Sequence, residues 1–111
     1  MLNADEVLLR QKLGHLQAVL AERGESAWAD RLSGVLAGSD VQLHEFLASN
    51  SLWGGSGSLA DMAGMEQGRP TRRAIEAALI DLGHAQIEAG LVNQRTEWWV
   101  GAFRTWRDRG I

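Results

Sequence analysis

The sequence predicts an all-α fold, a single-domain bundle of about five helices with a glycine-rich loop in its middle. Apolar residues recur at spacings of three and four along most of the chain, which is the period of one helical face. Residues that favour strands are scarce, because the chain has no tyrosine and few valine, isoleucine and threonine residues. Its 111 residues match the usual length of one domain, so we expect residues 1–111 to form a single α-helical unit.

The first predicted helix runs from about Asp5 to Arg23. Asn3 is a favourable N-cap, acidic residues follow it in the first turn, and Gly24 has the position of a C-cap. The apolar face of this helix consists of Leu9, Leu13, Leu16 and Leu20. One side of the helix is therefore expected to lie in the core.

Two shorter helices are expected next, the first of them capped by Ser26 and paired with its predecessor as a helical hairpin. The apolar stripe of this second helix is Trp28, Leu32, Val35 and Leu36. The run Gly38, Ser39 and Asp40 closes it and caps a third helix. The apolar face of the third helix is formed by Leu43, Phe46 and Leu47.

The middle of the chain is a predicted loop. Residues 49–57 hold glycine or serine at four successive positions after Trp53, and no apolar period continues through them. Ser58 is placed to cap a single helical turn that ends near Met62. Residues 64–70 are the expected flexible connection, because glycine and proline punctuate a polar segment there.

Two amphipathic helices fill the rest of the chain. The first is predicted to begin at Thr71 and to end or kink at Gly90. Its apolar stripe comprises Ile75, Ala78, Leu79, Leu82, Gln86 and Ala89, and its polar face carries Asp81, His84 and Glu88. The last helix extends from about Gln94 to Arg109. Its aromatic face consists of Trp98, Trp99, Phe103 and Trp106, opposite Arg104, Arg107 and Asp108.

Composition excludes several classes of function. Eleven basic and fourteen acidic residues give a formal net charge of −3, which disfavours a general nucleic-acid binder and a protein drawn to an anionic membrane. Without cysteine the chain has no disulfide, no thiol nucleophile and no cysteine-bound zinc or iron–sulfur cluster. No cofactor is expected. Because the chain lacks an apolar run of roughly 18 residues and an evident signal peptide, we expect a cytoplasmic location.

The segment from Leu52 to Asp61, Leu-Trp-Gly-Gly-Ser-Gly-Ser-Leu-Ala-Asp, carries a specific glycine pattern. It resembles a box in a family of small uncharacterised bacterial proteins, in which an aromatic residue precedes Gly-Gly-Met-Gly-Ser, an apolar residue, Asn and Asp. Ser56 replaces the methionine of that box and Ala60 the asparagine. The preceding helices and turns are also similar, so the resemblance covers residues 7–62. It implies a helical fold and a bacterial origin, brings no established activity, and hints at toxin immunity.

The glycine-rich loop is the first candidate site, with Trp53, Gly54, Gly55, Gly57, Ser58 and Asp61 as its residues. Closely spaced glycines let successive N–H groups converge on a small anion at a helix start. The spacing matches neither a dinucleotide-binding motif nor a P-loop. The alternative is a tight structural turn in which Trp53 is buried and Asp61 caps local N–H groups. A positive φ at Gly55 would then make Gly55→Val destabilising.

A metal site is the weaker candidate. Asp81, His84 and Glu88 share one helical face at spacings that can hold a metal inside a bundle. Such a site needs matching ligands from another helix, and neither His15 nor His44 has a carboxylate at Glu-x-x-His spacing. We therefore interpret the three residues as a solvated polar face and predict no metal site.

The aromatic face of the last helix is the second candidate site, formed by Trp98, Trp99, Phe103 and Trp106 beside Arg104. Each such ring can bury about 150–250 Å². If the face packs inward it is core, whereas an exposed tryptophan beside arginine has the composition of a protein-interface hot spot. Because the face is wider than one packing seam, we expect at least one of its tryptophans to be accessible in the monomer.

The function we expect is the binding of another protein, in its most specific version by a bacterial immunity protein that neutralises a cognate toxin. No catalytic residue is assigned, because no serine and histidine match a nucleophile elbow or an ordered triad. Two alternatives stay open. One is a small-ligand or anion-binding domain, with or without enzymatic activity, centred on the loop from Trp53 to Asp61. The other is a structural homodimer sealed by the tryptophan face.

Overall fold

The structure, a computed structural model that describes residues 4–110, has the all-α fold that the sequence predicts. Its helices are α1 (Ala4–Glu22), α2 (Ser26–Ala37), α3 (Asp40–Leu47), α4 (Leu59–Met62), α5 (Arg69–Ala89) and α6 (Thr96–Arg109). The described residues contain no strand. The single turn predicted after Ser58 is α4, and the other five helices correspond to the five apolar periods of the sequence.

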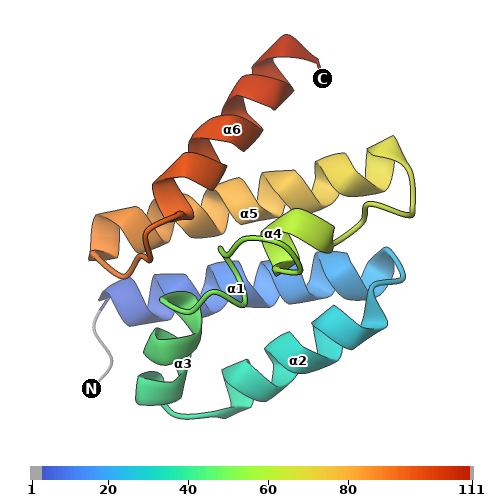
Figure 1. Cartoon of the computed structure of the whole chain (residues 1–111). Helices are drawn as coiled ribbons and strands as arrows, with labels where there is room; N and C mark the ends of the chain where they lie inside the picture. The colour runs from blue at the N-terminus through green and yellow to red at the C-terminus, as the bar shows by residue number, and fades with distance from the viewer. Residues whose placement is uncertain (1–3, 111) are drawn as a thin grey trace.

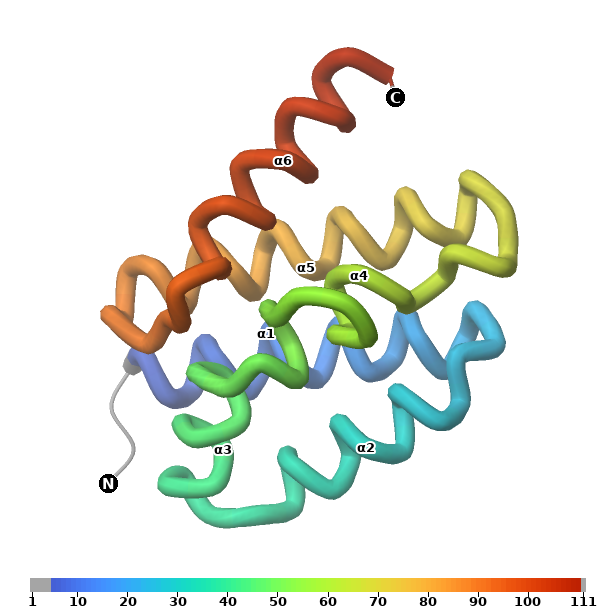
Figure 2. The backbone as a smooth tube through the Cα atoms, in the orientation of Figure 1, coloured from blue at the N-terminus to red at the C-terminus, as the bar shows by residue number. Residues whose placement is uncertain are grey.

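Helices α1 and α5 are the two long central elements (Figure 1). Helix α1 packs against both α2 and α5, and α5 packs in addition against α6. The tube view shows α2 and α6 on opposite sides of the α1–α5 pair (Figure 2). Helix α6 leaves the bundle at an angle, so its C-terminal half extends beyond the other helices.

One buried core draws residues from all six helices. The four leucines predicted for the first helix, Leu9, Leu13, Leu16 and Leu20, are fully buried. Burial of each such side chain contributes about 1.5–3 kcal/mol to folding, so α1 is held mainly by this face. The Cα radius of gyration is 13.1 Å, which is the size expected of one compact domain of this length.

The start of α2 differs from the prediction. Ser26 is the first residue of the helix and not its cap, because Glu25 occupies the N-cap position without a side-chain capping bond. The Glu25 carboxylate instead reaches the connection before α5. Its Oε1 accepts hydrogen bonds from the Gly64 N–H at 2.9 Å and from Gln67 Nε2 at 3.1 Å. A glutamate that could have capped its own helix thus joins two distant segments.

The last two helices also begin at other residues than predicted. Helix α5 starts at Arg69 instead of Thr71, because Gly68 adopts a φ of 90° as N-cap and a proline, whose ring presets a helical φ, lies in the first turn. It ends at Gly90, whose φ of 73° is left-handed, so the helix terminates there and does not kink. Helix α6 starts at Thr96, two residues later than expected.

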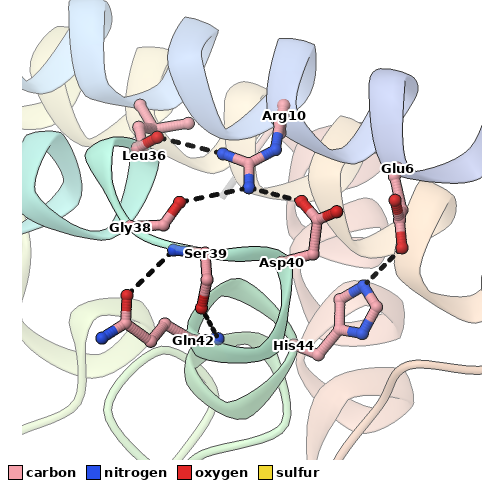
Figure 3. A network of polar contacts seen from close by, with 8 residues as sticks. All are labelled: Glu6, Arg10, Leu36, Gly38, Ser39, Asp40, Gln42 and His44. Atoms are coloured by element: carbon pink, nitrogen blue, oxygen red, sulfur yellow. Dashed lines mark hydrogen bonds and ion pairs between the residues drawn. The ribbon is translucent and has the colours of Figure 1, made fainter. Parts of the chain in front are cut away.

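Arg10 attaches α1 to the turn between α2 and α3 (Figure 3). Its guanidinium donates to the carbonyl oxygens of Leu36 at 3.0 Å and Gly38 at 3.4 Å, and it pairs with Asp40 Oδ1 at 2.6 Å. A capping box at Ser39, within the run that was predicted to cap the third helix, fixes the same turn from the side of α3. These contacts hold the helical hairpin against the third helix.

Candidate functional site

Trp53 anchors the central loop in the core. Its side chain is fully buried, as predicted, and its indole Nε1 donates to Gln86 Oε1 at 2.7 Å. The amide nitrogen of Gln86 donates in turn to the carbonyl oxygens of Leu47 at 3.0 Å and Leu91 at 2.9 Å. Gln86, predicted as one position of an apolar stripe, is therefore the buried polar residue that joins the loop to the ends of α3 and α5.

Two more side chains hold the loop to the C-terminal part of the chain. Asn93 Nδ2 donates to the carbonyl oxygens of Ser49 at 2.8 Å and Trp53 at 2.7 Å. The indole Nε1 of Trp99 donates to the Gly54 carbonyl oxygen at 2.9 Å in a buried contact. The loop is thus fastened to this part of the chain at residues 49, 53 and 54.

The loop glycines differ in what they require. A Cβ on Gly54 would lie 2.1 Å from the carbonyl oxygen of Asn50, so this position has no space for a side chain. Gly57 has a φ of 89°, in the left-handed region. Gly55 is exposed, does not have a positive φ, and has open space where its Cβ would stand. The condition for a destabilising Gly55→Val is therefore not met, and Gly54 and Gly57 are the constrained positions.

Backbone N–H groups at the end of the loop donate inside the chain. The Gly57 N–H donates to Asp61 Oδ2 at 3.0 Å, and the Asp61 N–H donates to the predicted cap Ser58 Oγ at 3.3 Å. The N–H groups of residues 58, 59 and 60 donate to the carbonyl oxygens of residues 55, 51 and 52, respectively. Because these donors already have acceptors, the N–H groups of residues 57–61 take part in the turn and are not free to bind an anion.

Helix α6 divides its aromatic residues between core and surface. Phe103 is fully buried and Trp99 is 9% exposed, whereas Trp106 is partly buried and Trp98 is 62% exposed. Ring centroids are 5.0 Å apart for Trp98 and Trp99, 5.3 Å for Trp99 and Phe103, and 5.7 Å for Phe103 and Trp106. Arg104 is exposed on the same helix. The expectation of an accessible tryptophan in the monomer is confirmed by Trp98.

A cleft of about 340 Å³ opens between α4, α5 and α6. It is lined by Asp61, Met65, Arg72, Glu76, Trp99 and Trp106. Asp61 comes from the predicted loop site, and Trp99 and Trp106 come from the predicted aromatic face. The structure thus joins parts of both predicted sites in a single cavity, which we call the α4–α6 cleft.

Arg72 and Glu76 are the charged pair of the α4–α6 cleft. Arg72 Nε lies 2.9 Å from Glu76 Oε2, one helical turn further along α5. The other two guanidinium nitrogens donate to the carbonyl oxygens of Ala60 at 2.6 Å and Ala63 at 2.7 Å. The guanidinium carbon also lies 5.3 Å from the ring centroid of Phe103. Arg72 therefore serves the protein's own structure with each of its nitrogens.

Only one of the two carboxylate oxygens of Glu76 has a partner in these contacts. Its side chain is 9% exposed, and Oε1 is buried without a hydrogen-bond partner. Reasoning from the sequence did not single out this residue or Arg72. The available signal was the spacing of the two residues, because an arginine and a glutamate four positions apart on a helix can pair, and Glu76 borders the apolar stripe.

A second cleft, of about 360 Å³, lies between the α1–α2 turn and the connection before α5. Its lining includes Glu25, Trp28, Met62 and Gln67. Two of these side chains already have polar or cationic neighbours, since Glu25 accepts the bonds described above and the Arg31 guanidinium lies 5.5 Å from the Trp28 ring centroid. This cleft has no unsatisfied buried group among its lining residues.

The predicted polar face of α5 is exposed at Asp81, His84 and Glu88, which fits its interpretation as a solvated surface. Among residues 4–110, no three histidine or acidic side chains gather closely enough to bind a metal ion. Within the same residues, no helix combines the length and the apolar character needed to cross a bilayer.

No protein-family model, curated protein or solved structure that we compared with this chain matches it. The resemblance of the box from Trp53 to Asp61 therefore rests on its residues alone. In the structure this box forms the tight loop and the α4 turn, and its last residue lines the α4–α6 cleft.

Proposed function

We propose that this protein binds another protein through a surface centred on Trp98 and the adjoining α4–α6 cleft. The observation that carries the proposal is the exposure of Trp98, a large aromatic side chain that stands 62% in solvent. Its ring contacts that of Trp99, which lines the cleft, so the exposed tryptophan and the cavity adjoin each other. Tryptophan is enriched among interface residues whose truncation costs about 2 kcal/mol or more.

An exposed methionine supports the same surface. Met65 lines the cleft and is 60% exposed. Methionine has a flexible, polarisable side chain that adapts to the shape of a partner. Exposed large apolar side chains beside charged ones, here Met65 with Asp61 in the lining of the cleft, have the composition of an interface core and its rim.

Neutralisation of a toxin is the most specific form of this proposal. An immunity protein blocks its toxin by shape and charge and needs no catalytic groups of its own. The support comes from the exposed aromatic surface and from the resemblance of the Trp53 to Asp61 box to small bacterial proteins. The anion-binding alternative is less favoured, because the N–H groups at the end of the loop already have acceptors.

The proposal is tested by Trp98→Ala, with Val41→Ala as the matched control. Val41 is 65% exposed on α3, a helix that contributes no residue to the lining of the α4–α6 cleft. The protein is expressed together with the product of its neighbouring gene, and the affinity between the two is measured by calorimetry. Trp98→Ala should weaken binding by about 30-fold or more and leave the thermal stability unchanged. Val41→Ala should change the affinity by less than about threefold, which corresponds to about 0.6 kcal/mol of binding free energy.

Acrylamide quenching of tryptophan fluorescence supplies the second readout. Trp98 should be quenched in the free protein and protected in the complex. Equal affinities of the Trp98→Ala variant and the parent protein would contradict the proposal. Protection of Trp98 that depends on the concentration of this protein alone would identify the structural homodimer instead.

A further inference from the structure

We infer that the α4–α6 cleft binds an organic cation, and that in the complex this cation is a lysine or arginine side chain of the partner protein. The second half of the inference rests on the proposed function. The first half rests only on the charge, burial and ring geometry of the cleft, and it can be tested without any partner.

The charges of the cleft favour a cation. Asp61 and Glu76 bring two carboxylates, and Arg72 brings the one basic group among the lining residues. Arg72 is committed to Glu76 Oε2 and to two backbone carbonyl oxygens. One negative charge is therefore left over among the side chains that line the cavity, and this charge attracts a cation.

The unsatisfied oxygen of Glu76 adds the second, independent observation. Its Oε1 is buried without a hydrogen-bond partner, in a side chain that is 9% exposed and lines the cleft. A buried carboxylate oxygen needs a donor, because the desolvation of a charged acceptor is otherwise uncompensated. Ammonium and guanidinium groups are donors that also carry the complementary charge.

Two tryptophan rings complete the recognition of a cation. Trp99 and Trp106 both line the cleft, and the face of an indole ring attracts cations within about 6 Å of its centroid. The ring of Trp99 is held in place by its bond to the Gly54 carbonyl oxygen, and Trp106 packs edge-on against Phe103. Fixed rings beside carboxylates form a site that is already arranged before the ligand arrives.

The dimensions of the cleft agree with a single side chain as its ligand. A volume of about 340 Å³ is close to the lower end of ordinary ligand pockets, which measure roughly 300–1,000 Å³. The cleft is bordered by the exposed Met65 and adjoins Trp99, the neighbour of the exposed Trp98. A partner that covers these apolar groups would bring one of its own basic side chains to the opening.

The cation site is tested by NMR titration of the full chain with n-butylammonium and, as the neutral isostere, n-butanol. The indole N–H resonances of Trp99 and Trp106 should move saturably with the ammonium ion and should not move with the alcohol. The fully buried Trp53, bonded to Gln86, is the internal reference whose resonance should stay in place. Equal shifts with both compounds would overturn the inference, because the cleft would then be merely apolar.

Two variants remove the negative charge from the cleft, and a third serves as control. Glu76→Gln and Asp61→Asn should each weaken butylammonium binding at least threefold. Glu76→Gln removes the ion pair with Arg72 and could unfold the protein. Asp61→Asn keeps an acceptor for the Gly57 N–H, so it still tests the inference if Glu76→Gln does not fold. Asp108→Asn removes the same charge from an exposed position on α6, outside the cleft, and should leave binding unchanged. Unaltered binding by both cleft variants would overturn the inference.

The partner half of the inference is measured separately. In the complex, the partner should displace butylammonium, and replacing one interface lysine or arginine of the partner by methionine should restore the ammonium-dependent shifts. If butylammonium and partner bind at the same time, the cation site stands and the assignment of a partner side chain fails. If Trp98→Ala leaves partner affinity intact while the ammonium titration succeeds, the proposed binding surface fails and the cation site again stands.

Discussion

Gly54 occupies a position at which the loop between α3 and α4 leaves no space for a side chain. We expect Gly54→Ala to lower the free energy of unfolding by about 2 kcal/mol or more, because the new Cβ would lie 2.1 Å from a backbone oxygen of Asn50 that cannot rotate away. Gly55→Ala adds the same methyl group one residue later, where the space is open, and should change the stability by less than about 0.5 kcal/mol. Urea denaturation of both variants makes the comparison, and equal losses would show that the loop can shift.

Asp40 makes the stability of the helical hairpin depend on pH. The hydrogen bond from the Arg10 guanidinium, aided by its charge, holds the pKa of this carboxyl below its ordinary value of 3.8. A carboxyl whose pKa is lower in the folded state stabilises the fold above the unfolded-state value and loses that contribution as the pH falls through the folded-state pKa.

The difference in stability between the parent protein and Asp40→Asn should therefore be largest at neutral pH and shrink as the pH falls below 3.8. Thermal denaturation between neutral pH and pH 2 measures it. In an Arg10→Gln background the same substitution should show a much weaker dependence on pH. If the stability difference between the parent protein and Asp40→Asn stayed constant from neutral pH to pH 2, the pairing of Asp40 with Arg10 (Figure 3) would not be the source of a pH dependence.

Helices α5 and α6 approach each other at Gly83. A Cβ on this residue would stand 2.3 Å from Val100 Cγ2 and 3.3 Å from the Trp53 ring, so only glycine permits the observed packing. We expect Gly83→Ala to destabilise the protein by about 1–3 kcal/mol, although alanine is the better helix former. The control is Gly34→Ala in α2, where no atom lies within 4 Å of the added Cβ and the expected effect is a gain of about 0.5–1 kcal/mol. Similar gains for both variants would mean that α6 moves easily on α5.

Helix α5 illustrates how a single element carries both core and site. Along one side it buries Ile75, Leu79 and Leu82, and within the same buried surface it places Glu76 and Gln86. Gln86 has protein partners for its amide group, whereas one oxygen of Glu76 has none. The buried position of Gln86 is therefore explained by its hydrogen bonds, whereas Glu76 is the residue on which the inferred cation site depends.

The whole molecule should unfold in one transition. Helix α6 has α5 as its principal helical neighbour, yet Trp99 and Phe103 belong to the same buried core as Trp53. The Arg69 guanidinium also donates to the Gly110 carbonyl oxygen at 2.5 Å, which ties the end of α6 to the start of α5. We expect urea transitions followed by far-ultraviolet circular dichroism and by tryptophan fluorescence to have the same midpoint. An earlier fluorescence transition would show that α6 detaches first.

Local features of the sequence were sufficient to predict the helices, although the starts of α5 and α6 differ by two residues from the prediction. Leu9, Leu13, Leu16 and Leu20 predict the buried face of α1. Ser58 and the run from Gly38 to Asp40 were expected at helix starts, where the structure has Ser58 and Ser39 as N-caps. These predictions succeed because helical period and capping act over three or four residues. The misplaced cap at Ser26 failed for the opposite reason, since Glu25 is drawn to Gly64, far along the chain.

The candidate site was decided by tertiary structure. The sequence by itself identified Asp61, Trp99 and Trp106 as members of two separate sites, and only folding brings them together with Arg72 and Glu76 in one cleft. It also could not tell that Trp98 faces solvent while its neighbour Trp99 is buried. Helical spacing defines which residues share a face, but burial depends on where the helix packs. The angle at which α6 leaves α5 is set by contacts between residues distant in sequence, such as those around Gly83, which no local pattern records.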